Sequence, residues 1–160
     1  MDEGCKIRNQ ISKDAFNNMD INKSNCISRN QIYVYINGTF NKNIIDAHIE
    51  QLLCIRCDRI FDAMNIASDA KINVNQFQQF MHVFNFADDT NLDSLLFYAA
   101  DTNFYRSIDQ NQLRGMFEKL NISADNENVQ IIMNNLGERQ FDYPNYLRFI
   151  FDLRSEMNAD

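Results

Sequence analysis

Oxygen-bearing side chains recur at short intervals in one polar segment near the start of the sequence: Asp20, Asn22, Ser24, Ser28 and Gln31. Carboxylate, hydroxyl and amide oxygens spaced in this way can surround a hard cation such as Ca²⁺. They converge only if the chain turns sharply between two rigid elements. Apolar Phe16 and Met19 precede the segment, and Ile32 and Ile36 follow it, at the spacing of buried helix faces. The pattern predicts a helix, a short loop and a second helix.

This pattern recurs along the chain. Aligning four apolar residues defines four twelve-residue segments, named here loop 1 (20–31), loop 2 (65–76), loop 3 (101–112) and loop 4 (134–145). The aligned residues occupy the eighth position of each loop: Ile27, Ile72, Ile108 and Phe141. Phenylalanine stands four residues before the first three loops, and Gln130 before the fourth. Agreement among four segments predicts four copies of one structural unit.

The repeated segment resembles the EF-hand, the calcium-binding unit of the calmodulin superfamily, whose ligands come from loop positions 1, 3, 5, 7, 9 and 12. The resemblance implies an all-α fold of four helix-loop-helix units in two pairs, each pair joined at the eighth loop positions. We expect an N-terminal pair over residues 1–87 and a C-terminal pair over residues 88–160. The intervals between the aligned residues, 45, 36 and 33 positions, are similar to those of the sarcoplasmic calcium-binding proteins. That similarity implies one compact globule rather than two tethered lobes.

The loops depart from the EF-hand pattern where calcium needs it most. The twelfth position normally supplies two glutamate oxygens, but here it holds only neutral amides: Gln31, Gln76, Gln112 and Asn145. An amide offers one oxygen and no charge. The sixth position normally holds glycine for a sharp turn, and here holds Asn25, Ala70, Arg106 and Arg139. Asparagine tolerates the positive φ of that turn, so we expect loop 1 to keep its shape and the other three to change theirs.

Loops 1 and 3 retain the most ligand-like residues. Loop 2 has Ala67 and loop 4 has Leu136 at a ligand position, so both are expected to be structural. The candidate metal ligands are Asp20, Asn22, Ser24, Cys26, Ser28 and Gln31 in loop 1 and Asp101, Asn103, Asp109 and Gln112 in loop 3. Losing the charged bidentate ligand removes about 3 kcal/mol of binding free energy, roughly a hundredfold in affinity. We therefore expect no required cofactor, and only weak calcium binding.

The helices that carry the loops can be placed approximately. Residues 1–19 form the first, with Ile7, Ile11, Ala15 and Phe16 predicted to be buried. Gly38 is predicted to end the second helix, and the third is expected over residues 44–64. The sixth is predicted over residues 109–120, and Ser123 is a predicted N-cap of the seventh. Asp142 is predicted to cap the eighth, with Pro144 in its first turn.

The composition limits the classes of partner. With 45% apolar residues, a chain of 160 residues can form a full core. A net charge of −7 argues against nucleic acid and anionic membranes as partners and suits a basic helix. No apolar run is long enough to span a membrane, and the N-terminus lacks a signal-peptide pattern, which favours a cytoplasmic protein. Disulfides or a metal site are alternatives for Cys5, Cys26, Cys54 and Cys57, but reduced, packed thiols are expected.

Three functional hypotheses follow. The first is a calcium-independent, non-enzymatic adaptor, resembling a myosin light chain, that binds an amphipathic basic helix of a cytoskeletal or ciliary assembly. Its groove candidates are Phe80, Met81, Phe84, Met116, Phe117 and Phe149. The second is a cytosolic calcium buffer or sensor using loops 1 and 3. In the third, the phenylalanines and methionines are simply core. No arrangement typical of an enzyme stands out, and His48 and His82 are expected to be structural.

Overall fold

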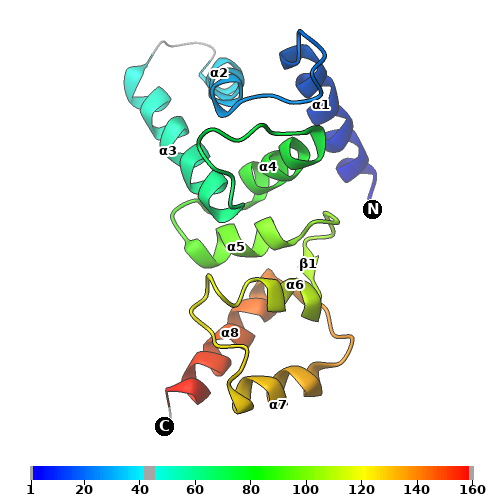
Figure 1. Ribbon diagram of the computed structural model, residues 1–160, viewed down its shortest axis with the longest axis vertical. Coiled ribbons are helices and arrows are strands. Elements are labelled where there is room, and N and C mark those ends of the chain that lie inside the picture. Colours follow the sequence, from blue (N-terminus) through cyan, green and yellow to red (C-terminus); the bar gives the residue numbers. More distant parts are fainter. Residues whose placement is uncertain (1, 42–45, 159–160) are drawn as a thin grey trace. The chain divides into compact units, whose positions relative to one another are not determined.

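The regular structure of the chain is mostly α-helical, as the sequence predicts. The computed structural model describes residues 2–41 and 46–158. Its helices are α1 (Glu3–Met19), α2 (Arg29–Phe40), α3 (Ala47–Ala63), α4 (Val74–Phe86), α5 (Leu92–Ala100), α6 (Gln110–Gly115), α7 (Glu127–Leu136) and α8 (Tyr143–Met157) (Figure 1). Two short strands, β1 (Ser107–Ile108) and β2 (Phe141–Asp142), complete it. The all-α fold class is confirmed.

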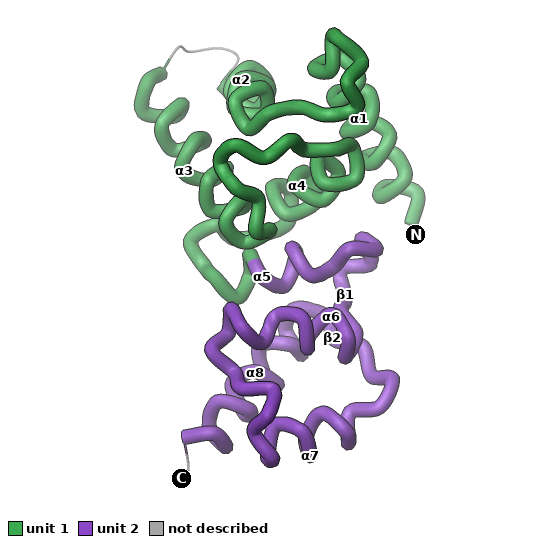
Figure 2. The backbone as a smooth tube through the Cα atoms, in the orientation of Figure 1, with its two compact units in different colours: residues 1–95 green, residues 96–160 purple. Residues whose placement is uncertain are grey.

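Two compact units make up the chain: unit 1, residues 1–95, and unit 2, residues 96–160 (Figure 2). The sequence-based division between residues 87 and 88 falls earlier, in the turn between α4 and α5. The new boundary lies inside α5, so this helix contributes to both units. The expectation of one compact globule concerns the arrangement of the two units and stays a prediction.

In unit 1, four helices surround a pair of loops. Helix α1 packs against α4, and α3 packs against both α2 and α4. Loops 1 and 2 meet at Ile27 and Ile72, which exchange both backbone hydrogen bonds at 2.9 and 2.8 Å. This is the pairing predicted from the aligned eighth positions, and it places both isoleucines in the core.

Unit 2 repeats the arrangement with a slightly longer pairing. Strands β1 and β2 are antiparallel, with Ser107 opposite Asp142 and Ile108 opposite Phe141. Helix α8 follows β2 directly and packs against α7. Loops 3 and 4 are therefore also joined at their eighth positions, as predicted.

Phenylalanines fill the centre of unit 1. The rings of Phe61 and Phe80 stack with their centroids 4.8 Å apart, and Phe77 and Phe84 flank Phe80 at 6.4 and 6.2 Å. Phe16 reaches Phe77 at 6.2 Å. The phenylalanines four residues before loops 1 and 2 thus join one aromatic cluster, which supplies much of the buried apolar area.

Several helix boundaries differ from those predicted. Helix α2 continues through Gly38 to Phe40 and is capped by Asn41. Helix α6 ends at Gly115 and is followed by turns rather than reaching residue 120. The N-cap of α7 is Asn126 instead of Ser123, because the Asn126 side chain accepts from the N–H groups of the first turn. Asp142 caps α8 with proline in the first turn, as predicted. The predicted third-helix residues 44 and 45 lie outside the described residues.

The buried face of α1 also differs from the prediction. Ala15 and Phe16 are buried, but Ile7 and Ile11 are 55% and 57% exposed. The buried positions in the first part of the helix are Cys5 and Ser12. The prediction was wrong for the two isoleucines because the stripe facing α4 is rotated away from them.

No helix within the described residues combines the length and apolar character needed to cross a membrane.

Candidate functional site

Loop 1 is organised around the carboxylate of its first residue. Asp20 is buried, and its Oδ1 accepts from both the backbone N–H and the hydroxyl of Ser24 at 2.9 Å. Its Oδ2 accepts from the backbone N–H of Asn25, also at 2.9 Å. The chain turns here through left-handed residues Lys23 and Asn25, with φ of 51° and 60°. The Asp20 carboxylate therefore stabilises the turn through hydrogen bonds from Ser24 and Asn25 of the same loop.

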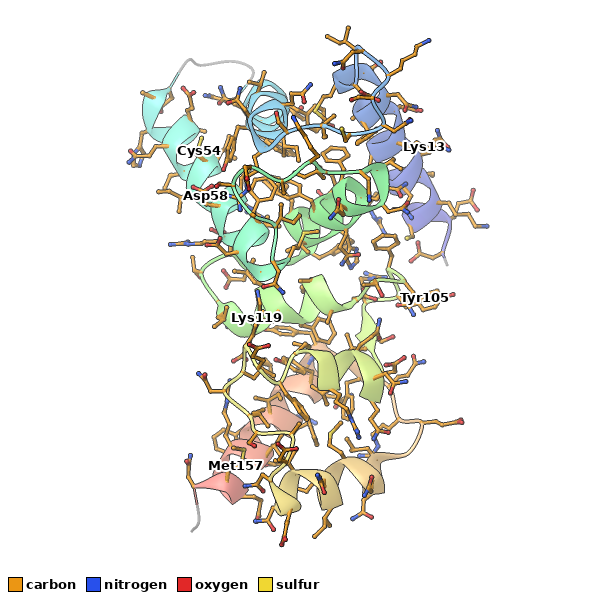
Figure 3. All side chains as sticks on the ribbon, viewed as in Figure 1. Lys13, Cys54, Asp58, Tyr105, Lys119 and Met157 are labelled. Carbon is orange, nitrogen blue, oxygen red and sulfur yellow. The ribbon has the colours of Figure 1, made fainter. Side chains whose placement is uncertain are left out.

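Loop 3 has the same construction. Asp101 is fully buried, and its two oxygens accept from the N–H groups of Tyr105 at 3.1 Å and Arg106 at 2.7 Å. Phe104 and Arg106 are left-handed, with φ of 63° and 58°. The expectation that arginine at the sixth position would change this loop was wrong. Hydrogen bonds to a buried carboxylate offset the strain of about 1 to 2 kcal/mol at a left-handed residue with a Cβ atom. Figure 3 shows Tyr105 projecting outward from this loop.

Loops 2 and 4 have a different course, as expected. The left-handed residue in loop 2 is Asn65 at the first position, and in loop 4 it is Gly137 at the fourth. The sixth residues, Ala70 and Arg139, do not adopt positive φ. Neither loop has a carboxylate at its first position. Each unit therefore pairs one loop whose sixth residue is left-handed with one whose sixth residue is not.

The side-chain amide of Gln31, at the end of loop 1, both accepts and donates a hydrogen bond within the protein. The Oε1 atom of Gln31 accepts from the backbone N–H of Ser28 at 2.8 Å. Its Nε2 atom donates to the carbonyl of Met19, the residue before the loop, also at 2.8 Å. The side chain thus connects the beginning and the end of loop 1. A glutamate here would lack the N–H donor for the Met19 carbonyl.

The other glutamines at the twelfth position make the same type of contact, each at the start of the helix that follows its loop. Gln112 and Gln76 accept from the N–H groups of Asp109 and Asn73, each at 2.9 Å. In each case the ninth residue is the N-cap of the following helix and bonds the glutamine N–H in return, which is a capping box. Sequence reasoning treated these glutamines only as lost ligands. Their spacing after Ser28, Asn73 and Asp109 is itself the capping-box signal.

These contacts do not fit a calcium cage. A calcium ion requires the oxygen of the twelfth residue to face the loop centre, but the Gln31 oxygen is aimed at the Ser28 N–H. The carbonyl of Cys26 accepts from the Ser24 hydroxyl at 3.0 Å. Asn22 and Asn103 are exposed, and Ser28 and Asp109 act as helix caps. Within the described residues, no cluster of three His, Cys, Asp or Glu side chains could hold a metal ion.

An arginine that sequence reasoning missed joins loop 1 to loop 2. The Arg29 guanidinium lies over the Phe61 ring, 4.4 Å from its centroid. It donates to the carbonyl of Ile66 in loop 2 and pairs with Asp58 of α3 at 3.9 Å. The Asp58 carboxylate also accepts from the hydroxyl of Tyr33, and Figure 3 marks Asp58 on α3. A fixed cation thus connects the two loops of unit 1.

Burial raises the pKa of three groups in unit 1: Tyr33, Cys54 and Cys57. Burial first, and then the hydrogen bond and charge of Asp58, raise the pKa of Tyr33 to about 12. Burial is also the largest cause that raises the pKa of Cys57 to about 12, with smaller contributions from Cys54 and Asp58. Burial likewise raises the pKa of Cys54. The thiols of Cys54 and Cys57 stay protonated at neutral pH. Cys5 and Cys57 are buried, as expected for packed thiols, whereas Cys26 and Cys54 are partly exposed.

The residues predicted to line a partner groove lie mostly in the core. Five of them are buried: Phe80, Met81, Phe84, Met116 and Phe117. The sixth, Phe149, is partly exposed and packs on Phe141 with ring centroids 5.2 Å apart. In this structure the six residues do not form an open groove. Phe80, Met81 and Phe84 are buried in unit 1, and Met116 and Phe117 are buried in unit 2. This arrangement agrees with the hypothesis that these phenylalanines and methionines are core.

No protein-family model matches this chain, and comparison with curated proteins found no match.

Proposed function

We propose that this chain is a non-enzymatic adaptor of EF-hand type that binds a helical segment of another protein without calcium. The observation that carries the proposal is the Gln31 side chain, whose amide connects Met19 to Ser28. That contact supports a conformation of loop 1 held by protein groups in place of an ion ligand. The paired loops of both units support it further, because backbone pairing of Ile27 with Ile72 and of Ile108 with Phe141 joins them through the protein's own groups.

The proposed partner is an amphipathic helix with basic residues, since the chain carries a net charge of −7. We place the protein in the cytoplasm, as a subunit of a cytoskeletal or ciliary assembly. Isothermal titration with calcium at physiological magnesium tests the calcium-free part of the proposal. We expect a dissociation constant no tighter than about 100 μM, whereas a value of about 1 μM would contradict it. Affinity capture in chelator and in calcium should then recover the same partner.

A cytosolic calcium buffer or sensor is the alternative, and one observation favours it. Loops 1 and 3 share a buried carboxylate at the first position and the left-handed turn at the sixth. If that alternative holds, titration would show two tight sites, and substituting Asp20 and Asp101 would remove one each. The adaptor hypothesis expects neither result.

A further inference from the structure

Exposed apolar side chains lie in loop 1 of unit 1 and on the two helices that flank it. Ile11 projects from α1, Ile21 from loop 1 and Val34 from α2, and they are 57%, 86% and 66% exposed. Ile7 extends the group by one turn of α1. Single exposed apolar residues are common on protein surfaces, but a contiguous set marks an interaction site.

Ile11, Ile21 and Val34 line a groove of about 620 Å³ between α1 and α2. Apolar side chains make up most of its lining: Ile11, Ala15, Met19, Ile21, Val34 and Tyr35. Tyr35 contacts the core at its inner side, with its ring 5.9 Å from that of Phe77 in an edge-on arrangement. The groove is therefore bordered by an aromatic side chain that is packed against the core of unit 1.

The polar part of the lining has a single sign of charge. Among the described residues that line the groove, Asp14 carries the one formal charge, and the others that are polar are the neutral amides Asn18, Asn30 and Gln31. The Asp14 carboxylate accepts from the Gln10 side chain at 2.9 Å, a contact along the same helix. An occupant that complements this groove is apolar where it meets Ile11 and Val34, and cationic beside Asp14.

We propose that the α1–α2 groove is the docking site for an amphipathic helix of another protein, with apolar residues three or four positions apart and a Lys or Arg beside Asp14. The inference rests on the proposed function and gives it a surface, in place of the buried phenylalanines and methionines. A second copy of this chain fits less well. In a two-fold symmetric contact through this groove, the Asp14 carboxylates of the two copies would face the same apolar centre with no cation between them.

The test uses two synthetic helices of about 18 residues, or five turns, with the same leucine stripe. One carries lysine and the other glutamate on its polar face. Fluorescence anisotropy of each peptide with the full chain, in chelator, measures binding. We expect the lysine peptide to bind at least tenfold more tightly than the glutamate peptide. Asp14→Lys should reverse that preference.

Two variants with matched exposure locate the site. Ile11→Asp should weaken the lysine peptide at least tenfold, while Leu52→Asp, at a 52% exposed apolar residue of α3, should leave its affinity unchanged. Because both side chains are exposed, both variants should fold, and circular dichroism checks this. Amide chemical-shift changes upon adding the peptide to the wild-type chain give a second readout, and should lie on α1, loop 1 and α2.

Several outcomes would overturn the groove. They are equal losses in Ile11→Asp and Leu52→Asp, no binding of either peptide, shift changes elsewhere, or self-association that Ile11→Asp abolishes. Failure of the proposed function gives a different result. Tight calcium binding would contradict the calcium-free adaptor while leaving peptide affinities as they are. A natural partner that binds Ile11→Asp as strongly as wild type would overturn the groove and leave the adaptor standing.

Discussion

The side-chain amide of Gln31 donates to the carbonyl of Met19 at 2.8 Å, so the last residue of loop 1 is bonded to the residue just before it. Substituting glutamate removes that donor and places a carboxylate near a carbonyl oxygen. We predict that Gln31→Glu lowers the free energy of unfolding by about 1 to 2 kcal/mol without calcium, the range of a lost hydrogen bond to a part-buried group. Chemical denaturation in chelator measures this.

The same variant should gain calcium affinity, because a bidentate carboxylate returns to a loop that keeps its first aspartate and its left-handed turn. We expect about a hundredfold tighter binding in calorimetry. Gln76→Glu is the matched control, since Gln76 makes the same capping contact in loop 2, where Ala67 cannot ligate. Equal gains in both variants would contradict this account of loop 1.

Arg29 is predicted to stabilise unit 1 as a fixed cation. Arg29→Met keeps much of the side-chain volume but loses the bond to the Ile66 carbonyl and the pairing with Asp58. We expect a loss of about 1 to 3 kcal/mol in urea denaturation, with Arg29→Lys intermediate because lysine cannot stack its charge flat on Phe61. Arg148→Met, on the exposed side of α8, should stay within about 0.5 kcal/mol of wild type. A similar loss in the control would argue against a specific role for Arg29.

Alkaline pH should destabilise the protein through Cys57. Its pKa is raised from 9.0 in the unfolded chain to about 12 in the folded one, so its thiol remains protonated in the folded state while the unfolded state ionises. Stability is thus complete below pH 9 and declines as the pH rises toward 12. Thermal unfolding from pH 8 to 11 measures this decline, and Cys57→Ala should flatten it. Tyr33 titrates over a neighbouring range, from 10.0 to about 12, so the comparison is best made in a Tyr33→Phe background.

Phe80 is predicted to be a core residue and not part of a binding surface. It is fully buried and stacks on Phe61, so Phe80→Ala should cost about 3 to 5 kcal/mol of stability. Phe151→Ala, at a 71% exposed phenylalanine of α8, should cost no more than about 0.5 kcal/mol. Near-wild-type stability of Phe80→Ala in denaturation would instead favour a groove that opens at this residue.

The sequence predicted the features that depend on repetition. The four loops and the pairing of Ile27 with Ile72 follow from aligned apolar residues, because the same buried position recurs in each copy. Asp142 was also found as a cap, since the helix start has a strong local signal.

Features that depend on neighbouring elements could not be predicted in the same way. Helical spacing alone does not fix which side of α1 faces α4, so the exposure of Ile7 and Ile11 was missed. The left-handed Arg106 was missed because its strain is offset by a hydrogen bond to a buried carboxylate that only the fold brings near. Arg29 reaches Ile66 across a large separation in sequence, which no local pattern reveals.

The unequal loops within each unit have a consequence for how a response to divalent ions could be engineered. Loops 1 and 3 keep both the first aspartate and the left-handed sixth residue, while loops 2 and 4 have neither. We therefore expect that substitutions confined to one loop per unit are enough to build a switch responsive to divalent ions. The neighbouring loop, joined through Ile72 or Phe141, would then act only as a passive brace.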